Sequence, residues 1–210
     1  MTKLVVLSHK NNFEKIAEAF SQGKIVCIPT DTTYCMSCDA TNIKAIHAIY
    51  HIKNRSLKKR LPVFVADLKM AQRYVSFYST ELQILKYYWP GALTIVSRIL
   101  RNTNLPDILV NNGKIAIRVP DYKIIQNICN DINKPIIATS VNISSHSSLN
   151  NVEEIIKTFY NAIDYIVRDL TLCTNDNLIP STIIEFIEKD KFKILREGRV
   201  LRRSLDSIIF

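Results

Sequence analysis

The chain has 210 residues, of which 47% are hydrophobic and 22% charged, and its formal net charge is +9. No run approaches the ~20 apolar residues of a membrane span, and the N-terminus does not resemble a signal peptide, so we expect a soluble protein without membrane contact. Five cysteines, an odd number, fit a reducing compartment better than a disulfide framework, so we expect a cytoplasmic location. The positive charge attracts anions such as nucleotides, RNA or lipid headgroups, but a composition bias accounts for it equally well.

The predicted helices and strands alternate along the chain. The first helix carries Phe13, Ile16 and Phe20 at helical spacing, and a glycine ends it. In chain order we expect a strand at 5–7, a helix at 12–22, a strand at 24–28, a helix at 42–51, a strand at 62–66, helices at 68–75 and 80–88, strands at 93–99 and 114–119, a helix at 122–132, a strand at 135–138, a helix at 152–160, and strands at 165–167, 182–187 and 192–195.

This order of elements is not a regular βαβ repeat. It favours an α/β fold with a twisted mixed sheet of parallel and antiparallel strands and helices packed around it. No internal repeat, low-complexity block or linker stands out, so we expect a single domain over residues 1–210 that ends in a basic tail at 199–210.

Polar side chains gather where the predicted strands begin or end, or follow a helix. These groups are TDTTY (30–34), KNRSLKKR (53–60), Arg118, TSVN (139–142), Ser181-Thr182 and REGR (196–199). Each alone is explained by helix capping, turn formation or a solvated surface. Their coincidence at several strand ends, where open α/β sheets bind ligands, instead indicates a binding site.

The residue types in these groups suit a small zwitterion bound together with a polyphosphate. Arginine binds a carboxylate through two hydrogen bonds, threonine hydroxyls both donate and accept, and several cations on one loop neutralise a triphosphate. The sequence shows neither a nucleophile paired with a base nor a Walker A or G-x-G-x-x-G motif. We therefore expect no catalytic side chain and a reaction driven by positioning and charge neutralisation, as in phosphoryl or adenylyl transfer.

The pair Cys35 and Cys38 forms a C-x-x-C motif, which invites a redox or zinc interpretation. A single such motif is a weak signal, because no second pair of cysteines or histidines lies at matching spacing. We favour two partly buried structural thiols.

Seven motifs in order resemble those of the YrdC/TsaC family, the threonylcarbamoyl-AMP synthases. They are PTDTTY, CDA, IYHIKNR, WPGALT, IAIRVPD, ATSVNIS and the pair PSTI and LREG. Each motif alone is weak, but seven in the same order are specific, and they span residues 25–198. The resemblance implies one YrdC-like domain with a concave, positively charged cavity.

The resemblance also implies a reaction. L-threonine and bicarbonate or CO2 form a carbamate that attacks the α-phosphate of ATP, which releases pyrophosphate and leaves threonylcarbamoyl-AMP. Partner transferases then move the threonylcarbamoyl group onto tRNA. Mg2+ is expected, because a triphosphate that loses pyrophosphate needs its leaving group neutralised.

The site residues follow from the matching motif positions. Those expected to bind threonine are Thr32, Arg118 and Ser181. Those expected to bind ATP are Lys53, Arg55, Lys59, Ser140, Asn142, Ser148 and Arg196. On this interpretation the threonine-rich loop after the strand at 24–28 reads a small hydroxylated amino acid.

Several positions depart from the family pattern. They are Cys35, Ser56, Arg60, Val141 and Ser145. We expect Cys35 and Ser145 to adopt conformations that glycine reaches more easily, and we expect the loss of two prolines at Ser56 and Arg60 to loosen the basic loop.

Two alternative functions remain open. An RNA-binding module would use the basic concave face, but stacking aromatics are absent from the run KNRSLKKR. A carbamoyl-transferring relative within a larger hydrogenase-maturation protein would need zinc-finger and acylphosphatase segments, which this chain lacks.

Overall fold

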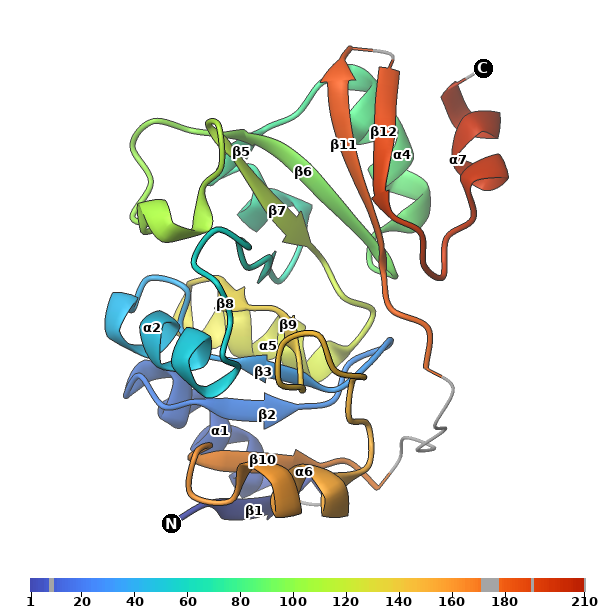
Figure 1. The fold of residues 1–210 in the computed structure, drawn as a ribbon. Coiled ribbons are helices and arrows are strands. Elements are labelled where there is room, and N and C mark those ends of the chain that lie inside the picture. Colours follow the sequence, from blue (N-terminus) through green and yellow to red (C-terminus); the bar gives the residue numbers. More distant parts are fainter. Residues whose placement is uncertain (8–9, 171–177, 190, 210) are drawn as a thin grey trace.

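The strands form two hydrogen-bonded sheets, one in the lower and one in the upper half of Figure 1. The computed structural model describes residues 1–7, 10–170, 178–189 and 191–209. Both sheets mix parallel and antiparallel pairs, so the predicted mixed α/β class is confirmed. The structure divides the strands between two sheets instead of one, and an isolated bridge between Asp39 and Ile136 links them.

The five-stranded sheet holds the threonine-rich loop. Its order is β1 (Lys3–Val6), β10 (Tyr165–Arg168), β2 (Val26–Ile28), β3 (Cys35–Ser37) and β9 (Thr139–Ser140). Strand β2 is buried throughout and pairs antiparallel with β3, so the loop between them lies at one end of this hairpin. We predicted no strand at Cys35–Ser37, because a three-residue run between polar residues carries too little periodicity.

The seven-stranded sheet carries Lys114, Arg118, Lys193 and Arg196, which are discussed below. Its order is β12 (Lys191–Arg196), β11 (Thr182–Glu188), β6 (Leu93–Ile99), β7 (Lys114–Arg118), β4 (Val63–Phe64) and β8 (Ile136–Ile137), and β5 (Val75–Ser76) pairs with β6. Strand β6 runs parallel to β11 and antiparallel to β7. Ser181 precedes β11 and Arg118 ends β7, and the two residues therefore lie near each other across β6.

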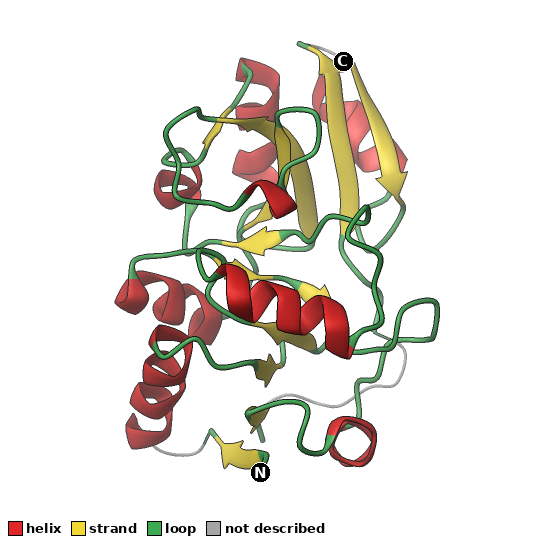
Figure 2. Ribbon diagram, turned by 60° about the vertical axis from the view of Figure 1, so that its left-hand side comes forward, coloured by secondary structure: helices red, strands yellow, loops and turns green. Residues whose placement is uncertain are grey.

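Helices surround both sheets (Figure 2). The helical segments are α1 (Lys10–Ser21), α2 (Ile43–Ile52), α3 (Leu68–Ala71), α4 (Ser79–Tyr88), η1 (Asp107–Leu109), α5 (Lys123–Ile132), α6 (Val152–Phe159) and α7 (Arg202–Ile209). Helix α1 contacts α5, and α4 contacts α7. Among the described residues, no helix combines the length and the apolar character needed to cross a membrane.

The C-terminal segment differs from the basic tail that we predicted. Residues Arg202–Ile209 form helix α7, whose Leu205 is fully buried. The Tyr88 hydroxyl of α4 donates to the carbonyl of Ser204 at 2.9 Å. The adjacent arginines obscured the apolar spacing of Leu205 and Ile208, and burial of this stripe makes the segment part of the fold.

The predicted helix at 68–75 is also shorter than expected. Helix α3 ends at Ala71, and Val75 begins β5, which pairs antiparallel with β6. Pairing with a neighbouring strand outweighs the helical spacing of this short segment, as tertiary contacts often do.

Candidate functional site

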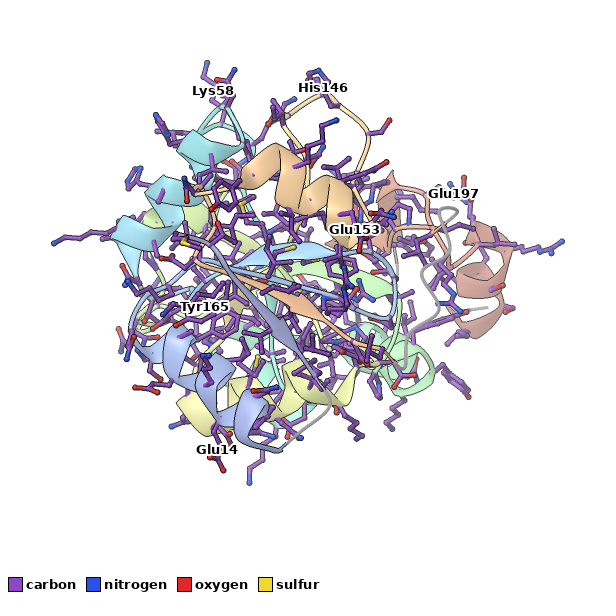
Figure 3. The ribbon with its side chains drawn as sticks, turned by 90° about the horizontal axis from the view of Figure 1, so that it is seen from below. Glu14, Lys58, His146, Glu153, Tyr165 and Glu197 are labelled. Carbon is purple, nitrogen blue, oxygen red and sulfur yellow. The ribbon has the colours of Figure 1, made fainter. Side chains whose placement is uncertain are left out.

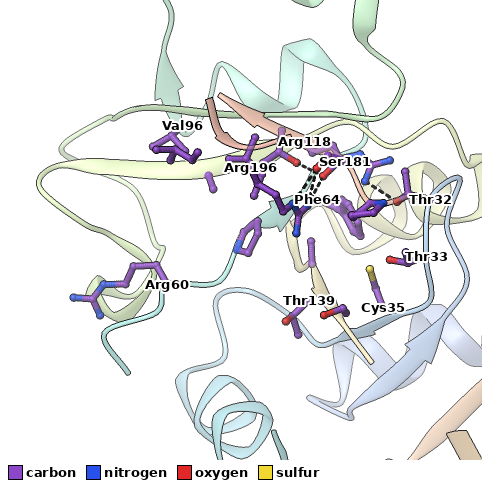
Figure 4. A pocket seen from close by; sticks show the side chains of 18 of the residues that line it. Thr32, Thr33, Cys35, Arg60, Phe64, Val96, Arg118, Thr139, Ser181 and Arg196 are labelled. Carbon is purple, nitrogen blue, oxygen red and sulfur yellow. Dashed lines mark hydrogen bonds between the residues drawn. The ribbon is translucent and has the colours of Figure 1, made fainter. Parts of the chain in front are cut away.

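A cavity of about 650 Å³ is lined by residues from both sheets (Figure 4). Thr32, Cys35 and Thr139 contribute from the five-stranded side, and Thr94 and Arg118 from the seven-stranded side. Its charged lining residues are Arg55, Lys58, Arg60, Lys114, Arg118, Lys193, Arg196 and Glu185. Among the described lining residues there are thus seven cations and one carboxylate, a balance that favours an anionic ligand.

Thr32 and Arg118 meet at one end of the cavity. Arg118 Nη1 donates to Thr32 Oγ1 at 2.9 Å, and Nε donates to the Gly91 carbonyl at 2.8 Å. The hydroxyl of Thr30 orders the loop, because it accepts from the backbone N–H groups of Thr32 and Thr33 at 2.9 and 3.1 Å. The structure thus brings the two predicted threonine ligands together on an internally bonded loop.

Asp31 is the neighbour that we did not predict. Its Oδ1 accepts from Arg118 Nη2 at 2.6 Å, and the side chains of Asp31 and Arg118 are only 11% and 4% exposed. Arg199 Nη1 donates to the Asp31 carbonyl at 3.0 Å. The sequence held one signal for this ion pair: the residue directly before Thr32 is an aspartate, whose charge is opposite to that of Arg118. The pair holds the guanidinium in one orientation before any ligand carboxylate arrives.

Ser181 lies at the same end of the cavity as Thr32 and Arg118, and Arg196 is bonded to Ser181. The Ser181 hydroxyl is 2.9 Å from Thr94 Oγ1 and accepts from Arg196 Nη2 at 3.0 Å. Arg196 also donates to the Ser181 carbonyl from Nε and Nη2, at 3.1 and 2.8 Å. Figure 4 shows Thr32, Arg118, Ser181 and Arg196 gathered at this end of the cavity. We predicted Arg196 for the nucleotide, but its bonds place it against the predicted threonine ligand Ser181.

Two guanidinium groups therefore lie near each other at this end. Burial, and then the charge of Arg118, lower the pKa of Arg196. Its ordinary pKa is so high that it stays charged at neutral pH. Of Arg118 and Arg196, only Arg118 has a carboxylate partner in the described chain. The positive charge of Arg196 is therefore not neutralised by an ion pair with another described residue, and it favours a ligand anion at this end of the cavity.

The basic loop (residues 53–60) is held by its own arginines. Arg55 Nε donates to the Lys59 carbonyl at 2.9 Å, and Arg55 Nη2 donates to that of Arg60 at 3.1 Å. Arg60 Nη1 donates to the Leu57 and Ile108 carbonyls at 3.0 and 3.1 Å. These bonds tie the loop to itself and to Ile108. The loosening expected from the absence of two prolines stays a prediction.

The cations of the basic loop differ in whether they line the cavity. Arg55, Lys58 and Arg60 are in it, whereas the predicted ATP ligand Lys59 is not among the described residues that line the cavity. Arg60 Nε is buried without a hydrogen-bond partner in the described chain. We did not predict Lys58 or Arg60 as site residues, because sequence position alone does not say which way a loop side chain points.

The Ser140 loop (residues 140–148) borders the same cavity. Ser140, Asn142 and Ser148 are in its lining, and Ser148 Oγ is buried with no hydrogen-bond partner among the described residues. Ser140 Oγ donates to Asn142 Oδ1 at 2.8 Å. Figure 3 shows Lys58 and His146 at the same edge of the molecule, and both residues line the cavity. The basic loop and the Ser140 loop thus share one side of the site.

Lys53 is the predicted ATP ligand that lies elsewhere. Its side chain is 1% exposed, and it is not among the described residues that line the cavity. Its ammonium group donates to Ser140 and Asn142 instead. Burial, and after it the charge of Arg55, lower the pKa of Lys53 to about 8.

The cysteines behave as structural thiols, as expected. Cys35 and Cys38 are buried free thiols, and burial raises the pKa of Cys35 to about 11 and that of Cys38 still higher. The described residues contain no group of three or more histidine, cysteine, aspartate or glutamate side chains that could hold a metal ion. A thiol that stays protonated at neutral pH is a poor nucleophile and a poor metal ligand.

The two departures from glycine have different outcomes. Ser145 has φ +71°, a left-handed conformation that glycine reaches more easily, so that expectation is correct. Cys35 is not among the described residues with positive φ and lies in strand β3, so the expectation for Cys35 is wrong. Pairing with β2 and β9 gives Cys35 the extended backbone that any side chain tolerates.

The fold and the cavity define an α/β protein with a cavity lined by residues of two mixed sheets. A family model named for Sua5, YciO and YrdC and described as "Telomere recombination" matches residues 18–198. The chain belongs to this Sua5/YciO/YrdC family.

Relatives with assigned names resemble most of the chain. A protein of Methanocaldococcus jannaschii, named provisionally as a threonylcarbamoyl-AMP synthase, is 35% identical over 189 residues, which cover 90% of this chain and 86% of that protein. The threonylcarbamoyl-AMP synthase of Wigglesworthia glossinidia brevipalpis is 30% identical over 191 residues, covering 89% of this chain and 94% of the relative.

Solved structures share the fold. P. abyssi Sua5, described as complexed with L-threonine, superimposes with a TM-score of 0.88 at 23% identity over 100% of this chain. This chain spans 61% of that Sua5 chain. E. coli YciO superimposes with a TM-score of 0.84 at 20% identity, over 95% of this chain and 97% of YciO.

Proposed function

We propose that this chain is a threonylcarbamoyl-AMP synthase, a nucleotidyltransferase that uses L-threonine, bicarbonate or CO2, and ATP. The names of its relatives support this activity. The observation that carries the proposal is the separation of two kinds of polar lining in one cavity. Thr32, Arg118 and Ser181 lie at one end, and the basic loop and the Ser140 loop lie along one side.

The end with Arg118 suits an amino acid. Arg118 has five N–H donors, of which three are bonded to Gly91, Thr32 and Asp31. Within the described chain, two donors therefore remain for a ligand carboxylate. The hydroxyls of Thr32 and Ser181 face the same end and suit the hydroxyl of threonine. The guanidinium is preorganised, which lowers the entropy lost on binding.

The rest of the lining suits a nucleoside triphosphate. The ammonium group of threonine first loses one proton to solvent and becomes a free amine. The amine nitrogen then bonds to the carbon of CO2 and a second proton leaves to solvent, which gives a carbamate. A carbamate oxygen then attacks the α-phosphorus, the bond from that phosphorus to the β-bridging oxygen breaks, and pyrophosphate leaves. Arg55, Lys58 and Arg60 would neutralise the charge that builds on the leaving group, so no catalytic acid or base is needed.

The part of the chain that the structure describes offers no protein site for the expected Mg2+. The described residues offer no cluster of carboxylates, and Glu185 of the cavity lining is already paired with Lys114 and Lys193 at 2.8 and 2.9 Å. We therefore assign the ion to the triphosphate substrate, whose phosphate oxygens would hold it.

The chemistry of the proposed product indicates which proteins would act after this one. Threonylcarbamoyl-AMP is a reactive mixed anhydride, so transferases that modify tRNA in the cytoplasm would consume it. An RNA-binding module is the second candidate, but the names of the relatives favour the enzyme.

The proposal predicts that pyrophosphate release depends on three components: ATP, threonine and bicarbonate. The purified protein should release pyrophosphate from ATP when threonine and bicarbonate are both present, and omission of either should reduce release to background. An enzymatic pyrophosphate assay with each component left out in turn measures this. Release of inorganic phosphate, or release without threonine, contradicts the activity.

A second prediction concerns the Thr32 hydroxyl. Thr32→Val keeps the shape but removes the acceptor of Arg118 Nη1, so we expect the affinity for threonine to fall about tenfold, equivalent to ~1.4 kcal/mol. The affinity for ATP should stay nearly unchanged, and the loss of stability should be about 1 kcal/mol. Titration calorimetry and thermal melting measure the two effects.

Thr80→Val is the matched control. The Thr80 hydroxyl donates to the Lys189 carbonyl, and Thr80 is not among the described residues that line the cavity. It should therefore melt earlier and bind threonine normally. If Thr32→Val behaves like this control, the threonine-rich loop is only structural.

A further inference from the structure

Lys53 has no donor left for a ligand. An ammonium group has three N–H donors, and the Lys53 ammonium donates to three oxygens of the Ser140 loop. They are the Ser140 carbonyl, the Asn142 carbonyl at 2.9 Å and Asn142 Oδ1 at 2.7 Å. A phosphate could bind Lys53 only after at least one of these bonds breaks in a site that is 1% exposed.

The backbone of Lys53 is tied to the same loop. Its carbonyl accepts from the Ser144 N–H at 2.8 Å, and its own N–H donates to the Ile49 carbonyl at the end of helix α2. Helix α2 therefore ends on a residue that is bonded to the Ser140 loop through both its backbone and its side chain. Asn142 extends the network, because its Nδ2 donates to the His146 carbonyl at 2.7 Å.

Lys53 also starts the basic loop. Arg55 follows two residues later, and Arg55 holds that loop through the Lys59 and Arg60 carbonyls. One side chain thus fixes where the basic loop leaves helix α2 and how the Ser140 loop lies against it. The two loops contribute Arg55, Ser140 and Asn142 to the same cavity.

We propose that Lys53 is a positioning residue that sets the Ser140 loop against the basic loop and does not bind the phosphates of ATP. This inference rests on the proposed synthase function. It replaces the ATP-binding role that the resemblance implies for this position. A buried ammonium bonded to carbonyl groups is a point charge that orients a loop, whereas Arg55 and Lys58 remain to face phosphates.

The inference makes a specific prediction for a series of ligands. In Lys53→Met the Ser140 loop loses its anchor, so adenosine, AMP and ATP should all bind more weakly by the same factor, about tenfold. A direct phosphate contact would instead weaken ATP strongly and leave adenosine unchanged. Titration calorimetry of the three ligands against the wild type, Lys53→Met and the control Lys44→Met measures the ratios. Lys44 is an exposed lysine of helix α2 that is not among the described residues lining the cavity.

Each outcome decides between these roles. An equal loss for adenosine and ATP supports the inference, and a loss confined to ATP overturns it. A lower melting temperature with unchanged affinity for all three ligands also overturns it, because Lys53 would then be only structural. Failure of the wild type to bind ATP contradicts the proposed function itself.

A second variant covers the case in which Lys53→Met does not fold. Lys53→Arg keeps the positive charge, but a planar guanidinium does not direct its donors as a tetrahedral ammonium does. We expect Lys53→Arg to lose affinity for adenosine and ATP equally. Retention of ATP affinity by this variant would show that the charge, and not the loop anchor, is what Lys53 supplies.

Discussion

Replacing Arg118 by lysine is expected to cause the largest loss of function among single substitutions in this site. Lysine cannot bond Gly91, Thr32 and Asp31 and still grip a carboxylate through two parallel bonds. We expect the affinity for threonine to fall at least about a hundredfold, equivalent to ~2.8 kcal/mol. Pyrophosphate release should fall in parallel at low threonine, and titration calorimetry with threonine is the direct measurement.

Arg118→Lys will also affect folding, because the ion pair with Asp31 is nearly buried. Removing one partner of such a pair costs ~3–5 kcal/mol, and lysine should keep part of this because it retains the charge. Arg98→Lys is the matched control, since Arg98 is an exposed residue of the neighbouring strand β6. Normal binding of threonine by a folded Arg118→Lys protein would mean that Arg118 supports the fold and that the threonine site lies elsewhere.

Asp31→Asn separates the two contributions of this pair. The amide keeps the shape and a hydrogen bond but loses the charge that orients Arg118. If Asp31 mainly orients the guanidinium, threonine should bind several-fold more weakly. If Asp31 instead competes with the substrate for Arg118, threonine should bind more tightly. Calorimetry on this variant distinguishes orientation from competition.

The parts of the site that could be predicted are those where chain order and chemistry coincide. Thr32, Arg118 and Ser181 stand at strand ends, and because β6 lies between β7 and β11, the sheet itself brings Arg118 and Ser181 together. Ser140 and Asn142 follow the same logic at the end of β9. The alternation of apolar and polar segments locates these strand ends along the chain, and the motif positions select the residues at them. The order of the strands within each sheet, which brings the residues together, comes from the structure.

The parts that could not be predicted depend on where long side chains point. Lys53, Arg55 and Lys58 lie within one run of basic residues, yet Lys53 is buried and Lys58 lines the cavity. Arg196 turns toward Ser181 because β12 is an edge strand next to β11. Motif spacing fixes a residue's position on an element, but the direction of a side chain with several rotatable bonds depends on partners far along the chain.

Replacing Arg55 by alanine is expected to cause the second large loss, this time in the use of ATP. Arg55 is partly buried, lines the cavity and donates to the Lys59 and Arg60 carbonyls. Alanine removes a guanidinium that can contact phosphate oxygens and also releases the backbone of the basic loop. We expect the KM for ATP to rise about a hundredfold, or ~2.8 kcal/mol, while the affinity for threonine changes less than about twofold.

Lys58→Ala is the matched control for this prediction. Lys58 also lines the cavity, but its side chain is exposed, and an exposed charge contributes at most ~1 kcal/mol. Its effect on ATP should therefore be only a few-fold and should disappear at high salt, whereas the Arg55→Ala loss should persist because a loop held by hydrogen bonds is not screened. Equal, salt-sensitive losses at both positions would mean that the basic loop acts as a diffuse positive surface. The RNA-binding alternative would then account for this loop better than an ATP site does.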